Sequence, residues 1–191
     1  FIISFFIASC SSVPKYPDNA CKIFGEKYFY LKYTRAASKK WGVPISSILA
    51  VINKESGFRR FAKPKRTKLF KIIPYRRPSS SLGFSQAVNK TWDLYKKENN
   101  KLAALRISFK SSSDFIGWYF WKTNKINKVS LNDTRNMYLN YYLGWQAYKN
   151  KAYQTNKKAI IFAKSVEKQA KIYKSQLQEC KSVLNKSYII F

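Results

Sequence analysis

A chain of 191 residues, of which 46% are hydrophobic, is long enough to bury a core of its own, which indicates one domain and argues against a second. The 37 Lys and Arg outnumber the 9 Asp and Glu, and the formal net charge of +28 favours a polyanionic partner: nucleic acid, an anionic membrane surface or an acidic cell-wall polymer. A compositional bias of the genome explains the same excess equally well. The chain has no His and no CxxC spacing, so we expect neither a metal site nor a cofactor.

The chain begins with FIISFFIASC, an apolar stretch that is too short to span a bilayer and is typical of a secretion signal. Two small residues, Ala8 and Ser9, precede Cys10, and this order resembles a bacterial lipobox, whose cysteine is acylated. An ordinary signal peptide with a chance cysteine is the alternative. The serine after Cys10 implies, by resemblance to such lipoproteins, an anchor in the outer membrane. We therefore expect residues 1–21 to form a signal remnant and a short linker.

Hydrophobic periodicity in the rest of the chain predicts helices and almost no strands. An amphipathic helix is expected over residues 22–40, where Trp41-Gly42-Val43-Pro44 ends it, and a second helix over residues 45–56. The next segment, residues 58–82, contains KPKRTKLF and PYRRPSSS and is expected to be an extended basic loop. Loops of this length inside a compact domain are uncommon unless they are functional or disordered.

Four more helices are expected downstream of this loop. Helical spacing resumes in SQAVNKTWDLYKKEN, and DFIGWYFWKTNKI follows with Ser113 and Asp114 as its start signal. LNDTRNMYLNYY and residues 156–181 complete the set, and the latter segment has apolar residues on one face and cations on the other. We therefore predict a mainly α domain over residues 22–182, with a long basic loop, little or no β-sheet, and a C-terminal tail over residues 183–191.

Two cysteines, Cys21 and Cys180, remain after the lipobox cysteine is set aside. An even pair in an exported protein predicts a disulfide. Because the two residues lie near the ends of the domain, the bridge would join the first helix to the last, and it would stabilise the fold by about 4 to 5 kcal/mol in the chain-entropy model.

One carboxylate, Glu55, stands out in ILAVINKESGFRR because cations surround it in the sequence. In the helix expected over residues 45–56, Ile48, Ile52 and Glu55 recur along one face, so the carboxyl lies on the side that buries its neighbours. Gly57 is a plausible C-cap, which places the carboxyl in the last turn, at the negative end of the helix dipole. Desolvation and the dipole both raise the pKa, and a general acid needs such a carboxyl.

The alternative interpretation of Glu55 is a surface residue paired with Arg59 across one turn, which would contribute only about 0.2 to 0.5 kcal/mol. Gly57 interrupts that turn and weakens this interpretation.

Three motifs in this order resemble one known family. ESGF at 55–58, SLGFSQA at 81–87 and NYYLGWQAY at 140–148 are similar to the E-S, G-x-x-Q and A-Y-N-x-G motifs of the lytic transglycosylase domain in the goose-type lysozyme superfamily. RPSSSLGFSQAVNKTW and DFIGWY strengthen the resemblance to small, exported, lipoprotein-like members. The resemblance covers roughly residues 22–180 and implies a lysozyme-like helical fold.

The resemblance also implies roles for single residues. It makes Glu55 the catalytic acid, and it implies these contacts with the substrate: Ser56, Gly83, Phe84, Gln86, Tyr141, Tyr142 and Trp145. Tyr142 and Leu143 depart from the family pattern, which has Asn or His at the first position and often a polar residue at the second. Among the other aromatic residues, we expect Phe115, Trp118 and Tyr119 to belong to the core, whereas Trp145 and Tyr148 suit a sugar-binding groove.

The implied substrate is the glycan strand of peptidoglycan, and the implied reaction cleaves the MurNAc to GlcNAc β-1,4 linkage. Glu55 would act as both acid and base and leave a 1,6-anhydroMurNAc end. No second acid occurs between Glu55 and Asp93, and we expect Asp93 to lie in a first helical turn or to face solvent.

The rival interpretation of the function is a non-catalytic, cationic, peptidoglycan-binding envelope lipoprotein, because the third motif is altered. The basic loop over residues 59–77 suits anionic envelope polymers or peptide carboxylates, although a solvated charged surface is the ordinary interpretation. A nucleic-acid partner is not expected, since the chain is exported and contains no nucleic-acid-binding motif. We expect a monomer on the periplasmic side of the envelope, lipid-anchored to the outer membrane.

Overall fold

The computed structural model of the chain describes residues 13–69, 73–181 and Leu184. The predicted lipobox with Cys10, and all of the expected C-terminal tail except Leu184, lie outside these residues. Within them, no helix has both the length and the apolar character that a crossing of a bilayer requires.

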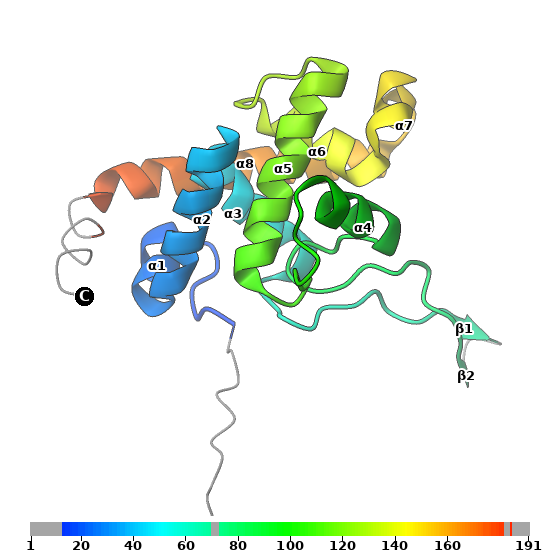
Figure 1. Cartoon of the computed structure of the whole chain (residues 1–191), viewed down its shortest axis with the longest axis horizontal. Coiled ribbons are helices and arrows are strands. Elements are labelled where there is room, and N and C mark those ends of the chain that lie inside the picture. Colours follow the sequence, from blue (N-terminus) through cyan, green and yellow to red (C-terminus); the bar gives the residue numbers. More distant parts are fainter. Residues whose placement is uncertain (1–12, 70–72, 182–183, 185–191) are drawn as a thin grey trace, which may run out of the picture.

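The described part of the chain is mainly helical, so the predicted fold class is confirmed (Figure 1). The longest helices are α5 (Phe109–Asn127) and α8 (Lys157–Glu179). Helix α2 (Tyr28–Trp41) packs along α5, and α8 packs across α3 (Ile45–Ser56) and α6 (Thr134–Leu143). The shorter elements are α1 (Ala20–Glu26), α4 (Asn89–Glu98), α7 (Trp145–Lys149) and a 3-10 turn over Ala152–Gln154.

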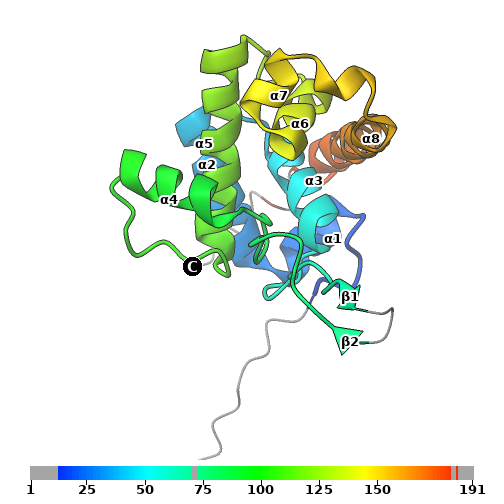
Figure 2. The ribbon, with the colours of Figure 1, turned by 90° about the vertical axis from the view of Figure 1, so that its right-hand side faces the viewer.

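The region predicted as an extended basic loop contains the β-structure found in the described residues. Strands β1 (Lys68–Leu69) and β2 (Ile73–Pro74) pair antiparallel and form a two-residue ribbon. In Figure 1 this ribbon lies at the end of a long excursion away from the helices, and Figure 2 shows it below them in the view turned by 90°. The prediction of little β-sheet is therefore confirmed.

Helix α3 lies at the centre of the fold, and its predicted bounds of 45–56 are confirmed. The run from Ile48 to Ile52 is completely or almost completely buried, so this helix contacts protein on nearly every side. Burial of each large aliphatic side chain contributes about 1.5 to 3 kcal/mol. Gly57 ends the helix in the left-handed conformation, with φ of +55°, as the sequence predicts.

The helix predicted over residues 22–40 is interrupted at Lys27, where the backbone leaves the helical region. Its two parts have different partners, since α1 contacts α8 whereas α2 packs against α5. An amphipathic pattern does not show this break because both halves bury an apolar face.

The predicted start of α5 at Ser113 and Asp114 is wrong. The helix begins at Phe109, and Ser108 is its N-cap, with a side chain that accepts a hydrogen bond from the Ser111 N–H. Asp114 is instead buried inside the helix, where it accepts hydrogen bonds from Trp41 Nε1 at 2.9 Å and from other donors on neighbouring elements. Tertiary partners for the carboxylate therefore override its preference for a helix start.

The Asp114 carboxylate connects three parts of the fold. Besides Trp41 of α2, the Tyr95 hydroxyl of α4 donates to it at 2.6 Å, and the Lys101 ammonium donates to the same oxygen. Burial alone raises the pKa of Asp114, but the hydrogen bonds from Lys101, Tyr95 and Trp41 outweigh it, so the pKa is lowered overall. Gly117 allows Trp41 to approach, because a Cβ there would lie 2.5 Å from the indole ring.

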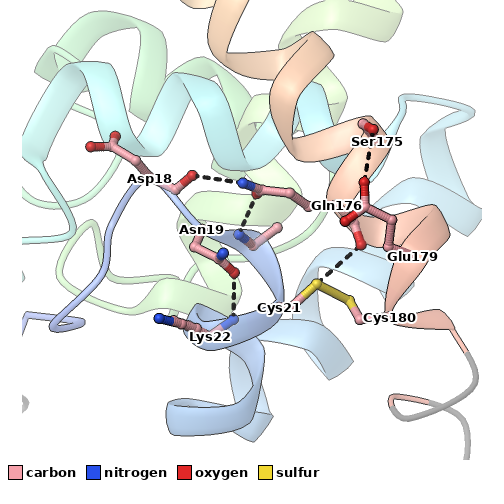
Figure 3. The surroundings of a disulfide bond; sticks show 9 residues. Asp18, Asn19, Cys21, Lys22, Ser175, Gln176, Glu179 and Cys180 are labelled. Carbon is pink, nitrogen blue, oxygen red and sulfur yellow. Dashed lines mark hydrogen bonds between the residues drawn. A yellow bond between two sulfur atoms is a disulfide. The ribbon is translucent and has the colours of Figure 1, made fainter.

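The predicted disulfide between Cys21 and Cys180 is present, with 6.1 Å between the Cα atoms (Figure 3). Gln176 reinforces it, because its side chain accepts from the Ala20 N–H at 2.8 Å and donates to the Asp18 carbonyl at 3.2 Å. The Cys21 sulfur also lies 3.0 Å from the Gln176 carbonyl, which is a contact and not a hydrogen bond, since a disulfide sulfur has no proton. The bridge therefore fixes α1 on α8.

We expect the double variant Cys21→Ser, Cys180→Ser to lose about 3 to 5 kcal/mol of unfolding free energy, because the bridge closes a loop with a sequence separation of 159 residues. Urea unfolding monitored by far-UV circular dichroism measures this loss. A reducing agent should lower the stability of the wild type by a similar amount and leave the double variant unchanged. An equal stability of oxidised and reduced wild type would contradict the prediction.

Candidate active site

The carboxyl of Glu55 lies in the last turn of α3, half-buried between this helix and α6. Its Oε1 atom accepts a hydrogen bond of 2.7 Å from the Tyr138 hydroxyl. No cation of the described chain forms an ion pair with it. The ammonium of the preceding Lys54 lies instead over the ring of Phe162, at 3.8 Å from its centroid. The carboxyl is therefore shielded from water without a bound counter-charge.

This environment raises the pKa of Glu55 from 4.5 to about 7. Burial is the largest cause, because it disfavours the charged carboxylate. The hydrogen bond from Tyr138 and the charge of Lys54 both lower the pKa, but burial outweighs them. Close to neutral pH the group is therefore present in both protonation states, as acid and base catalysis by one residue requires.

The alternative pairing of Glu55 with Arg59 is not formed. The Arg59 side chain turns back to the helix end, where its Nε donates a 2.9 Å hydrogen bond to the Ser56 carbonyl. The guanidinium thus caps α3, and the Glu55 carboxyl is hydrogen-bonded to Tyr138 instead.

The turn at residues 83–86 comes close to the chain that follows α3. Gly83 has φ of +75°, and a Cβ there would lie 2.1 Å from the Arg106 carbonyl oxygen, so only glycine fits. Its N–H donates to the Ala62 carbonyl at 2.9 Å. The Gln86 side-chain NH₂ donates to the same carbonyl at 2.9 Å and to the Gly83 carbonyl at 2.8 Å. Both amide hydrogens of Gln86 are thereby engaged, and its acceptor Oε1 is left for a ligand.

Two tyrosines of α6 connect this turn with the acid. Tyr138 donates to Glu55, and Tyr141 donates to the Ser85 carbonyl, next to Gln86. Their rings are 6.2 Å apart and nearly parallel, at 18°. Burial raises the pKa of Tyr141, and the negative charge of Glu55 raises it further. The last turn of α3, the 83–86 turn and one face of α6 therefore converge.

Other residues with expected substrate contacts lie in different surroundings. Ser56 is fully buried, and its hydroxyl donates to the Ile52 carbonyl of its own helix at 2.9 Å. Phe84 is 2% exposed and packs edge-on against Tyr30 and Phe109. Neither side chain is accessible to a ligand, so each acts on the site through packing.

Trp145 and Tyr142 are more exposed to solvent than Ser56 and Phe84. Trp145 is partly buried, stacks on Tyr119 with centroids 4.5 Å apart, and donates to the Thr123 hydroxyl at 2.9 Å. Tyr142 is 37% exposed and meets the ring of Phe162 edge-on at 5.6 Å. The expected core residues Phe115, Trp118 and Tyr119 are all buried.

Tyr138, which donates a hydrogen bond to Glu55, is a site residue that the sequence did not predict. The family motif begins two residues later, so motif matching passes over it. The available signal is helical spacing: Tyr138 precedes Tyr141 by three residues and therefore shares its face of α6.

A hollow of about 700 Å³ lies elsewhere among the described residues. The first turns of α3 and α6 and the outer part of α8 line it, and neither Glu55 nor Gln86 belongs to it. The site is therefore assigned from the chemistry of Glu55 and not from the size of a hollow.

The raised pKa of Glu55 makes the stability of the fold depend on pH. The folded state holds the proton of Glu55 more tightly than the unfolded state does. The resulting contribution to the unfolding free energy is complete below pH 4.5 and is lost as the pH rises through about 7. The unfolding free energy of Glu55→Gln, minus that of the wild type, should increase by about 2 to 3 kcal/mol from pH 4.5 to pH 8. Urea titrations at several pH values measure this difference.

The matched control is Asp93→Asn, which removes the same charge from a side chain that is 66% exposed. This control should not reproduce the increase. Parallel stability curves for the wild type and Glu55→Gln would contradict the assignment of a desolvated acid.

Comparison with known proteins agrees with this geometry. The family model described as "Transglycosylase SLT domain" matches residues 1–180. A search of the curated proteins finds no match. Because the family match spans most of the chain, the protein belongs to the transglycosylase SLT domain family, a family of lytic transglycosylases that act on peptidoglycan in the cell envelope.

Proposed function

We propose that this protein cleaves the MurNAc to GlcNAc β-1,4 linkage of peptidoglycan, with Glu55 as the single acid and base, and leaves a 1,6-anhydroMurNAc end. The observation that carries the proposal is the desolvated carboxyl of Glu55, with a pKa of about 7, beside the Gln86 turn. Membership of the family supplies the class of substrate.

The proposed reaction has two proton transfers through one group. Protonated Glu55 first gives its proton to the glycosidic oxygen as the bond to C1 breaks, and the N-acetyl group of the sugar relieves the positive charge at C1. The Glu55 carboxylate then removes the proton of the C6 hydroxyl, whose oxygen attacks C1 and closes the anhydro ring. The acid is thereby regenerated, and no water is consumed.

The surrounding residues suit this sequence of steps. Tyr138 donates to the carboxyl and favours its charged form, which exists between the two transfers. Tyr141 holds the Ser85 carbonyl, and this contact fixes the turn that presents Gln86. The free acceptor of Gln86 can receive a hydrogen bond from a sugar hydroxyl or N–H.

A mechanism with two carboxylates would need a second acid close to Glu55. The next acid along the chain, Asp93, is 66% exposed and pairs with Lys96 at 3.0 Å on the surface of α4. This arrangement supports the single-residue mechanism.

We further propose that the protein works as a monomer on the periplasmic side of the envelope, anchored to the outer membrane through acylated Cys10. The Ala-Ser-Cys sequence at residues 8–10 supports the anchor, and the family's action on peptidoglycan supports the compartment.

A non-catalytic peptidoglycan-binding protein is the second candidate function. The altered third motif favours it, since Tyr142 and Leu143 replace residues that are usually polar in the family. Tyr142 packs against Phe162 on the surface and offers no amide to a sugar.

Incubation of the purified protein with peptidoglycan should release anhydromuropeptides, which mass spectrometry identifies. Glu55→Gln keeps the shape of the side chain but has no proton to donate, and it should lower the rate by about 10²-fold or more. Release of no product by the wild type would support the binding protein instead. Products with reducing ends would indicate hydrolysis and contradict the anhydro mechanism.

The pH dependence of kcat/KM should show an alkaline limb near pH 7, because activity requires protonated Glu55. The hydrogen bond from Tyr138 lowers the pKa of Glu55, so Tyr138→Phe should move this limb to higher pH. Tyr153→Phe, which changes a tyrosine on the 3-10 turn, is the control and should leave the limb in place. An unchanged limb in Tyr138→Phe would contradict the role given to this hydroxyl.

A further inference from the structure

The segment between Glu55 and Gln86 forms a distinct feature, which we call the basic arm and define as residues 59–69 and 73–77. The sequence has no acid from residue 56 to residue 92. The described arm carries eight cationic residues, all of them exposed: Arg59, Arg60, Lys63, Lys65, Arg66, Lys68, Arg76 and Arg77.

The two sides of the arm are held together by hydrogen bonds. Thr67 N–H donates to the Arg76 carbonyl at 2.9 Å, and Tyr75 N–H donates to the Thr67 carbonyl at 2.7 Å. The Thr67 hydroxyl also donates to the Arg76 carbonyl, at 2.8 Å, and the Arg77 guanidinium donates to the Pro64 carbonyl. Strands β1 and β2 continue this pairing outward. The cations are therefore carried by a backbone whose two sides are paired, and Figures 1 and 2 show the course of this backbone away from the helices.

The base of the arm belongs to the candidate active site. The arm begins at Arg59, whose N–H donates to the Ser56 carbonyl at the end of α3. Ala62, still at the base, is the residue whose carbonyl receives both Gly83 N–H and the Gln86 side chain. A molecule bound between Glu55 and Gln86 therefore lies at the root of the arm.

None of the eight cations forms an ion pair with a carboxylate of the described chain. Helix α8 differs, because its Lys171 pairs with Glu167 at 2.6 Å. Two exposed aromatic rings lie among the arm cations, Phe61 at 66% and Tyr75 at 50% exposure. The arm therefore presents an uncompensated positive surface. At physiological salt, where the Debye length of the solution is about 8 Å, this surface attracts anions only over a short range.

We propose that the basic arm binds carboxylates of the peptides that the bound glycan strand carries, so that the enzyme prefers peptide-bearing strands to bare ones. The inference rests on the proposed function, because the peptides reach the arm only when their own strand occupies the site. Carboxylates on the bound strand fit better than a membrane surface, since the arm is joined to the Gln86 turn through Ala62. Attraction by exposed cations acts mainly on binding and depends on salt.

The test measures binding separately from cleavage, with the full chain carrying Glu55→Gln. The protein is sedimented with intact peptidoglycan and with glycan strands from which an amidase has removed the peptides. At about 0.15 M salt, intact peptidoglycan should bind several-fold more tightly, and the difference should disappear at about 0.5 M salt.

The arm variant is Lys63→Gln, Lys65→Gln, Lys68→Gln, which removes three exposed charges without touching the base of the arm. It should weaken binding to intact peptidoglycan about fivefold and leave binding to bare strands unchanged. The control is Lys157→Gln, Lys164→Gln, Lys168→Gln on α8, which removes the same charge from exposed positions and should have less than about a twofold effect.

Three results would overturn the proposal. The arm variant could bind intact peptidoglycan as tightly as its parent, both triple variants could lose affinity equally, or the arm variant could lose affinity only for vesicles of anionic lipid. The experiment measures binding and not turnover. Failure of the arm to bind peptides can therefore be told apart from failure of the proposed reaction.

Discussion

The removal of one carboxyl from water is the constraint on which this structure depends. Glu55 lies in the last turn of a helix that is buried on nearly every side, and within the part of the chain that the structure describes its carboxyl accepts one hydrogen bond, from a phenolic hydroxyl of α6. A bound cation at this position would have favoured the carboxylate and abolished its use as an acid near neutral pH. In a chain with 37 Lys and Arg, the absence of such a pair among the described residues is therefore what the proposed acid role of Glu55 requires.

The scaffold around the acid explains how this environment is maintained. Helix α8 packs across α3 and α6, the two helices that share the Glu55 to Tyr138 hydrogen bond. The disulfide fixes α1 on the far end of α8. On the other side, Asp114 joins α2, α4 and the chain after α4 to α5. The site is thus held by contacts distant in sequence, while the basic arm extends from it into solvent.

The sequence predicted features that depend on local patterns. The bounds of α3, its Gly57 cap and the cysteine pair follow from periodicity, from backbone preference and from the count of thiols. Tertiary contacts decided the rest. Asp114 is a good helix start by composition but has better partners inside the fold, and the burial of Ser56 and Phe84 depends on packing that motifs do not encode. Tyr138 was missed because its role depends on how α6 lies against α3.

The most direct measurement of the central claim is the titration of the glutamate carboxyls by carbon NMR in protein labelled at this residue type. The account predicts that one glutamate signal titrates with a pKa of about 7 and that this signal is missing from Glu55→Gln. If the signal assigned to Glu55 titrates near the ordinary value of 4.5, the carboxyl is hydrated and the proposed acid does not exist.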